Sequence, residues 1–219
     1  VHWALYYPLI LDPAGPGADR GVLGAQRALE AGRADQARAQ LESILAGDPS
    51  NPRALALASI VALVQNASDQ AADYAERAVA LSPEDGSAQL ALSYVRQARF
   101  DLAGARSAAD AAITINPDDA IAWARLAELL ASLGDTTAAI DAARRAVELA
   151  PGLSRTQSVL GFVALMRLEL DQATAAFETA TDLDPTDPLP RTGQALVKIR
   201  RGALGEGSPP GGTTGWGTT

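Results

Sequence analysis

Very few side chains in this sequence could act as nucleophiles, general bases or metal ligands. The chain has 219 residues, no cysteine and a single histidine, His2. The absence of cysteine excludes disulfides and thiolate chemistry, and a Ser-His-Asp triad or a histidine-based metal site would have to use His2. We therefore predict no metal site and no cofactor.

Carboxylates and glycines are the remaining candidates for chemistry. Asp118-Asp119 is an adjacent acidic pair, and three aspartates lie within residues 182–187. A calcium loop needs acidic residues at alternate positions followed by glycine and a distal glutamate, whereas prolines interrupt the second group. Residues 202–207 are rich in glycine, but their order is not that of a phosphate loop and no strand precedes them. These patterns contain no catalytic constellation, so we predict a protein that is not an enzyme.

The bulk composition indicates a helical protein that binds neither nucleic acid nor the membrane interior. The sequence is 47% hydrophobic but only 5% aromatic, so alanine and leucine supply most of the core, which favours helices over sheets. Its net charge of −8 argues against nucleic acid, whose phosphates require cationic partners. No apolar run reaches the roughly 18 residues needed to span a bilayer. We therefore expect no nucleic-acid partner and no membrane insertion.

A fixed period of 34 residues organises most of the chain. It is marked by five prolines, Pro49, Pro83, Pro117, Pro151 and Pro185. With each proline at position 32 of a unit, the units start near residues 18, 52, 86, 120 and 154, with a partial unit at 188. Position 20 is alanine in all five complete units, and position 8 is always alanine, serine or glycine. Small residues at these spacings let two antiparallel helices pack closely.

The residues between the two helical patterns of a unit predict a tight turn. Position 15 is Gly32, Asn66, Gly134 or Gly202 in four units, and such residues end helices in the left-handed conformation. Phe100 occupies this position in unit 3 and Leu168 in unit 5, so we expect those turns to close in another way. Aspartates follow the turn, and we expect them to accept hydrogen bonds at the start of the second helix; they are Asp35, Asp69, Asp101, Asp135 and Asp171.

These signals predict an all-α fold, an α-solenoid of about five helix–turn–helix repeats with a C-terminal capping helix. We expect three regions: an extended apolar segment at residues 1–17, a superhelix at 18–202 and a flexible Gly/Pro/Thr tail at 203–219. In the capping helix, Leu189, Leu196 and Ile199 are predicted to face inward. The expected helices span residues 18–31, 34–46, 52–65, 68–81, 86–98, 102–115, 120–133, 136–149, 154–167, 170–183 and 188–201.

The repeat resembles the tetratricopeptide (TPR) repeat, a helix–turn–helix unit of this period. Unit 4 resembles it best, through Trp123, Leu126, Ala127, Leu130, Gly134, Ala139, Ala146 and Pro151. The resemblance covers roughly residues 18 to 202. It implies a protein-binding scaffold whose first helices line a concave groove.

The resemblance also implies which residues face that groove. The expected set comprises Arg53, Ile60, Leu63, Val64, Leu90, Tyr94, Gln97, Glu128, Arg155, Phe162, Leu165 and Met166. The predicted wall is apolar with few charges. It lacks the Lys, Asn and Arg that grip a terminal carboxylate in chaperone-binding TPR domains. We therefore expect an apolar peptide segment as ligand.

The first residues of the chain do not belong to the repeat. They form an apolar, aromatic segment with Trp3, Tyr6, Tyr7, Leu9 and Ile10. Burial of such a segment is worth several kcal/mol at about 25 cal/mol per Å². The segment either folds over the first helix pair as a cap or docks into a groove, its own or that of a neighbouring copy. Docking onto a neighbour would make the protein a self-assembling structural element.

Residues 3–8, Trp-Ala-Leu-Tyr-Tyr-Pro, also resemble the junction before the repeats in bacterial proteins that join a FecR-like domain to a TPR array. That resemblance implies a bacterial protein that is periplasmic or extracellular, and it implies a folded domain before Val1. Composition alone is equally compatible with the cytoplasm.

Overall fold

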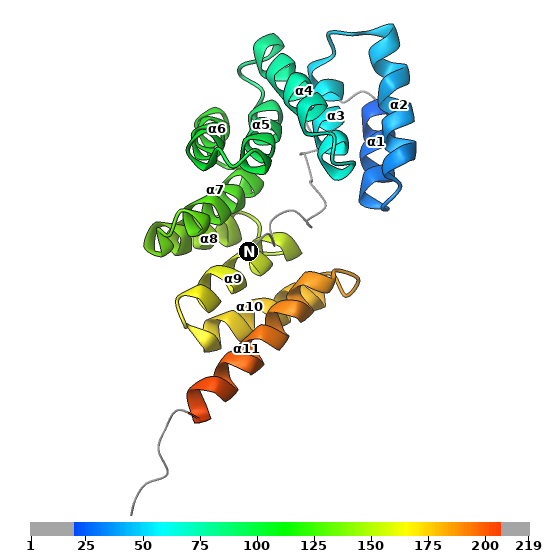
Figure 1. The fold of residues 1–219 in the computed structure, drawn as a ribbon. Coiled ribbons are helices and arrows are strands. Elements are labelled where there is room, and N and C mark those ends of the chain that lie inside the picture. The colour runs from blue at the N-terminus through cyan, green and yellow to red at the C-terminus, as the bar shows by residue number, and fades with distance from the viewer. Residues whose placement is uncertain (1–19, 207–219) are drawn as a thin grey trace, which may run out of the picture.

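The computed structural model describes residues 20–206, and within this range it contains eleven helices and no strand (Figure 1). All helices except the last lie within two residues of the predicted ranges, which confirms the all-α solenoid. The helices are α1 (Arg20–Glu30), α2 (Ala34–Gly47), α3 (Pro52–Val64), α4 (Ser68–Leu81), α5 (Gly86–Ala98), α6 (Leu102–Ile115), α7 (Ala120–Ser132), α8 (Thr136–Leu149), α9 (Ser154–Met166), α10 (Leu170–Leu183) and α11 (Pro188–Glu206).

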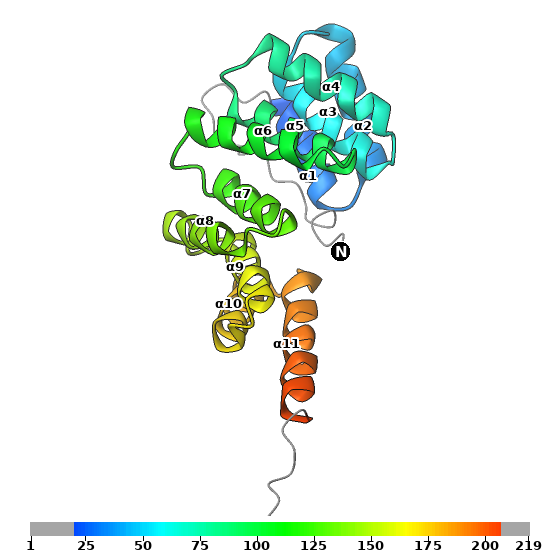
Figure 2. The same ribbon diagram turned by 60° about the vertical axis from the view of Figure 1, so that its left-hand side comes forward.

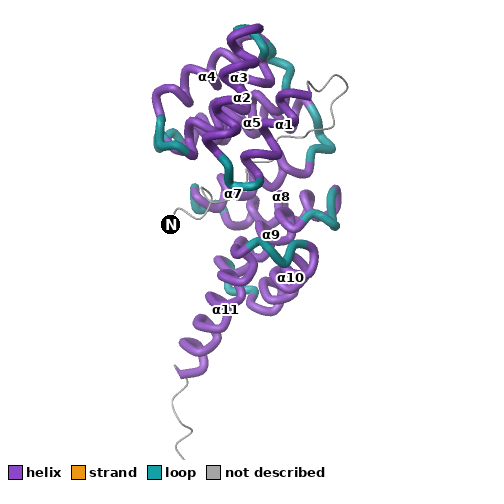
Figure 3. The backbone as a smooth tube through the Cα atoms, turned by 90° about the vertical axis from the view of Figure 1, so that its right-hand side faces the viewer, coloured by secondary structure: helices purple, strands orange, loops and turns teal. Residues whose placement is uncertain are grey.

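The helices pair within each unit and stack from unit to unit in chain order. Figures 1 and 2 show a curved array in which α5, α7 and α9 lie on the inner side and α6 and α8 on the outer side. First helices of successive units also contact each other, as α3 contacts α5 and α7 contacts α9. Figure 3 shows that short loops make every connection. Short loops force antiparallel pairing, so one face of each first helix points to the inside of the curve.

The core of each unit is built on small residues that allow close approach of the two helices. The five alanines at position 20, namely Ala37, Ala71, Ala105, Ala139 and Ala173, are all fully buried. In unit 5 the first helix, α9, carries Gly161, which lies against Phe177 of the second helix, α10. A Cβ added to Gly161 would lie 2.6 Å from Phe177 Cε1. A larger side chain does not fit there, because the Phe177 ring already fills the space.

Aspartate and asparagine side chains begin several helices, although not all of those expected. Asp101 Oδ1 accepts from Gly104 N at 2.8 Å, and Asp135 Oδ1 accepts from Ala138 N at 3.0 Å. The expectation is wrong for the second helices of units 1, 2 and 5, whose N-cap residues make no side-chain cap. There the aspartates Asp35, Asp69 and Asp171 lie inside the first turn of the helix, where a negative charge still interacts favourably with the helix dipole.

The turns of units 3 and 5 close in the same way as the glycine turns, contrary to the sequence expectation. Phe100 and Leu168 both have φ near +64°, beside +88° at Gly134. In each of these units the residue after the turn donates its N–H to a carbonyl five residues earlier, at 2.9 Å. The whole-unit packing therefore imposes the left-handed conformation, at a cost of about 1–2 kcal/mol for each bulky residue.

Candidate functional site on the inner face of the array

The structure divides the twelve predicted groove residues into a buried and an accessible group. Six are buried: Ile60, Leu90, Tyr94, Glu128, Arg155 and Phe162. Four are half-buried, namely Arg53, Leu63, Gln97 and Leu165, and two are exposed, Val64 at 56% and Met166 at 47%. The expectation that the whole set is open to the channel is therefore not met.

Packing against described neighbours accounts for part of this burial. The ring of Phe162 on α9 packs edge-on against Phe177 of α10, with 4.9 Å between the ring centroids. Tyr94 on α5 lies under Arg125 of α7, whose guanidinium carbon is 3.9 Å from the ring centroid. Both aromatic residues at position 9, Tyr94 and Phe162, are therefore packed against neighbouring helices and are not exposed in the channel.

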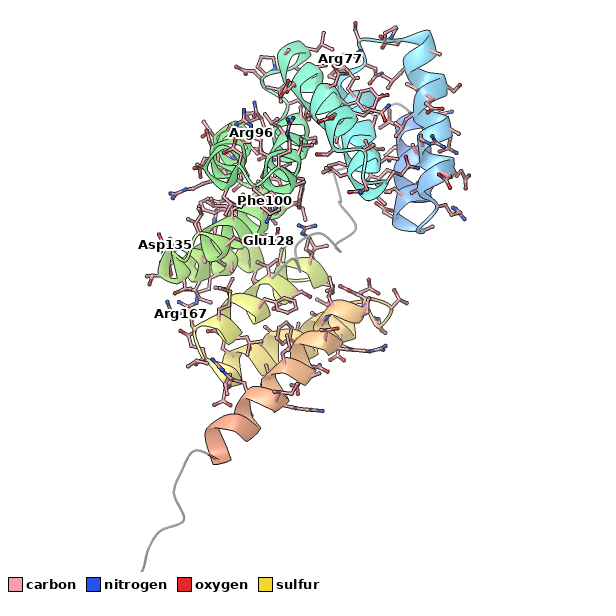
Figure 4. The ribbon with its side chains drawn as sticks, viewed as in Figure 1. Arg77, Arg96, Phe100, Glu128, Asp135 and Arg167 are labelled. Carbon is pink, nitrogen blue, oxygen red and sulfur yellow. The ribbon has the colours of Figure 1, made fainter. Side chains whose placement is uncertain are left out.

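A buried charge network joins three successive first helices at the centre of the inner face. Arg125 and Glu128 of α7 are fully buried, and Arg125 Nη1 donates to Glu128 Oε2 at 3.1 Å. Arg155 of α9 donates from Nη2 to Glu128 Oε1, also at 3.1 Å. Arg125 reaches α5 as well, donating from Nε to Ser93 Oγ at 2.9 Å and from Nη2 to Ser93 O at 3.1 Å. Figure 4 places Glu128 inside the array, whereas Asp135 and Arg167 lie at its outer edge.

Tyr94 completes the network through its hydroxyl group, which accepts a hydrogen bond from Arg155 Nη2. Burial raises the pKa of Tyr94 above its ordinary value of 10.0, and the Glu128 carboxylate raises it further, while both arginines act in the opposite direction. Burial has the largest effect, so the phenol stays protonated at neutral pH.

The charge network corrects the prediction of an apolar wall with few charges. Two guanidinium groups and one carboxylate lie in the interior, where desolvation opposes their mutual attraction. The sequence analysis included Glu128 and Arg155 in the wall but missed Arg125. One sequence signal was available: Arg125 and Glu128 are the two charged residues of the helix Ala120–Ser132, whose other residues are nearly all apolar.

Five accessible apolar residues lie at or just after the C-terminal ends of first helices. Leu63 and Val64 end α3, Leu165 and Met166 end α9, and between them Leu133, just after α7, is also exposed. We call these five residues the rim. The rim residues occupy positions 12 to 14 of units 2, 4 and 5, and neighbouring positions of stacked units lie toward the same edge of a solenoid.

Two polar side-chain atoms on first helices make no hydrogen bond to any described residue. They are Gln97 Oε1 on α5 and Ser158 Oγ on α9, and both are buried. Native proteins pair most of their buried polar atoms with hydrogen-bond partners, so these two atoms are exceptions to that rule.

The remaining predictions concern the N-terminal segment, metal binding and membrane insertion. Trp3, Tyr6, Tyr7, Leu9, Ile10 and His2 lie outside the described residues. Within residues 20–206, no group of three or more acidic or histidine side chains is arranged to hold a metal ion. No helix in the same range combines the length and hydropathy that a membrane span requires.

The repeat geometry agrees with a match to known sequences. The tetratricopeptide repeat profile matches residues 22–86 and 89–154, two stretches that together make up more than half of the chain. The chain belongs to the tetratricopeptide repeat family. No curated protein sequence matches this TPR chain.

Solved TPR structures share the fold at low sequence identity. TTC0263, a thermophilic TPR protein of Thermus thermophilus, has a TM-score of 0.74 and 22% identity over 82% of this chain and 97% of its own. MamA has a TM-score of 0.55 and 21% identity over 74% of this chain and 94% of its own. YrrB, described as a TPR protein with an unusual peptide-binding site, has a TM-score of 0.53 and 20% identity over 80% of this chain and 90% of its own.

Proposed function

We propose that this TPR chain is a non-catalytic scaffold that binds an apolar peptide segment of a partner protein on the inner face of its array. The observation that supports the proposal is the rim, an accessible apolar edge at the ends of α3, α7 and α9. The buried network fixes α7 and α9 relative to each other. A rigid wall lowers the entropic cost of binding, because the protein does not have to become ordered when the peptide arrives.

The proposed contacts follow from exposure. The peptide would pack against Val64 and Met166, with Leu63 and Leu165 behind them. Met166 has a flexible, polarisable side chain that adapts to varied apolar partners. The buried residues of the predicted groove set, Arg155 and Glu128 among them, would act beneath this surface by holding α7 and α9 in register.

Capture experiments with matched variants test this proposal. Full-length protein, the double variant Val64→Glu with Met166→Glu, and the control Leu81→Glu are used to capture partners from the source organism's lysate. Leu81 is similarly exposed but ends α4. Peptides that tile a captured protein are then titrated against all three proteins.

We expect a peptide that binds the wild type and the control alike and binds the double variant at least tenfold more weakly. All three proteins should keep the same thermal midpoint, because surface substitutions change stability by about 0.5 kcal/mol or less. A partner that binds the double variant as tightly as the wild type would show that the inner face is not the binding surface.

Self-assembly is a second candidate function, and the apolar composition of residues 1–12 supports it. In this case the segment of one copy would occupy the rim of the next, and contacts of this head-to-tail kind produce filaments when they do not close. Light scattering over a concentration series compares the full chain with a variant lacking residues 1–12. A concentration-independent monomer in both cases rules out assembly, and assembly of the full chain alone supports it.

A further inference from the structure

The last helix differs from every other first helix in length and in how it ends. Each of α3, α5, α7 and α9 has 13 residues and stops just before its turn, whereas α11 has 19 residues. It runs straight through Gly202, which occupies the position where Gly134 has φ +88°. The predicted turn at Gly202 is therefore wrong, and within the described residues the chain does not fold back to cover α11.

The repeat register shows which side of α11 is left uncovered. In the five complete units the small residue at position 8 is buried, at Ala25, Ser59, Ser93, Ala127 and Gly161. In α11 the residue at position 8 is Ala195, and it is exposed. The opposite side packs normally: Val197 is buried, and Gly193 lies so close to Phe177 that an added Cβ would be 2.3 Å from the ring.

An apolar stripe extends along the uncovered side. Ile199 follows Leu196 by three residues and Ala195 by four, so a helix places it on the same face as both. Leu196 is 43% exposed and Ile199 is 68% exposed. The sequence expectation that these two face inward is therefore wrong. The outer face of a terminal capping helix in a solenoid is normally polar, whereas the outer face of α11 carries this apolar stripe.

Basic residues border the stripe although the whole chain is acidic. Arg191 and Lys198 lie along one side of it and Arg200 along the other, by the same helical spacing. None of the three makes an ion pair with a described residue, whereas Arg201 bridges to Asp171 of α10. Two copies of α11 packed face to face would bring these cations together, which disfavours a symmetric pair.

We propose that this face of α11 is a docking site for an acidic amphipathic helix of a partner protein. The other units show the geometry, because in each of them the second helix packs against the first and the small residue at position 8 is buried. The docked helix takes that place in unit 6, with small and apolar residues against Ala195 and Ile199. Its acidic borders meet Arg191, Lys198 and Arg200. None of the stripe residues belongs to the rim, although Ile199 occupies the same repeat position as Leu63 and Leu165. The rim variant in the test below therefore separates this surface from the function proposed above.

A probe for this site can be taken from the chain itself. The peptide Ser68–Leu81 is the second helix of unit 2, with Ala71, Ala75 and Ala78 on its buried side and three acidic residues against one arginine. An i, i+4 crosslink on its outer face keeps the isolated peptide helical, since a 14-residue helix is marginal alone. The control peptide has the same crosslink and Lys in place of Asp69, Asp73 and Glu76.

Fluorescence anisotropy of both labelled peptides is measured against the full chain and three variants. We expect saturable binding of the acidic peptide and at least tenfold weaker binding of the lysine peptide. The pair Leu196→Ser with Ile199→Ser should weaken the acidic peptide at least tenfold, and Arg191→Glu with Lys198→Glu should reverse the preference. The rim variant Val64→Glu with Met166→Glu should bind like the wild type.

Equal binding of the two peptides, or binding unchanged by the Leu196 and Ile199 substitutions, would overturn the proposal. A dimer in sedimentation velocity that Ile199→Ser abolishes would also overturn it, because a second copy would then be the occupant. Unchanged far-UV circular dichroism and thermal midpoint in each variant confirm that folding is intact.

Discussion

Glu128 offers the sharpest test of how this array is held together. It is fully buried and accepts hydrogen bonds from Arg125 and Arg155, each at 3.1 Å. The substitution Glu128→Gln keeps the size of the side chain but removes the carboxylate that lies between two buried guanidinium groups. Breaking a buried ion pair from one side typically costs about 3–5 kcal/mol, because the partner charge is left uncompensated. We expect the free energy of unfolding to fall by that amount.

Urea unfolding followed by circular dichroism measures this change. The matched control is Glu148→Gln, whose exposed carboxylate lies 3.4 Å from Arg145. An exposed pair of this kind contributes about 0–1 kcal/mol, so the control should unfold nearly as the wild type does. The Glu128→Gln variant should also unfold over a broader range of urea, since the network couples α5, α7 and α9 and repeat arrays lose cooperativity when neighbouring units uncouple.

A triple variant separates charge from packing. Methionine at positions 125, 128 and 155 removes all three charges while filling a similar volume. Such replacements are often neutral or stabilising by about 1–4 kcal/mol. Two results would contradict this reasoning: a cost below about 1 kcal/mol for Glu128→Gln, or a triple variant as unstable as the single one. Either result would show that unpaired arginine charges are not what destabilises the Glu128→Gln protein.

Four further predictions concern the same helices. Tyr94→Ala with Phe162→Ala should lower the free energy of unfolding by several kcal/mol, because both rings are buried; a thermal midpoint within about 2 °C of the wild type would show that the rings are dispensable. Phe100→Gly should raise stability by roughly 0.5–1 kcal/mol by relieving a positive φ at a residue that is 76% exposed, and urea unfolding that shows a loss would contradict this. Gly161→Ala should cost about 1–3 kcal/mol by overpacking against Phe177, which the same measurement checks. The raised pKa of Tyr94 means that the unfolded chain loses this proton first, so stability should fall as pH rises above about 10; Tyr94→Phe should reduce that slope, and an identical slope in both proteins would refute the assignment.

Local sequence signals were sufficient to predict the helices and their pairing. The prolines at position 32, the alanines at position 20 and the apolar periodicity act within a few residues of the helix they define. Ten of the eleven described helices could therefore be placed within two residues. The same local reasoning failed at Phe100 and Leu168, because the packing of the whole unit imposes a backbone conformation that each residue alone disfavours.

The sequence by itself thus determined the repeat and, apart from the end of the last helix, the bounds of the helices to within two residues. Only the tertiary structure decided which of the predicted groove residues water can reach. Arg155 meets Glu128 and Tyr94 across 27 and 61 residues of chain, and Ile199 is exposed because no described helix packs on it. Burial and charge pairing depend on neighbours brought together by stacking, and a 34-residue pattern repeats the contacts within a unit without specifying those between units.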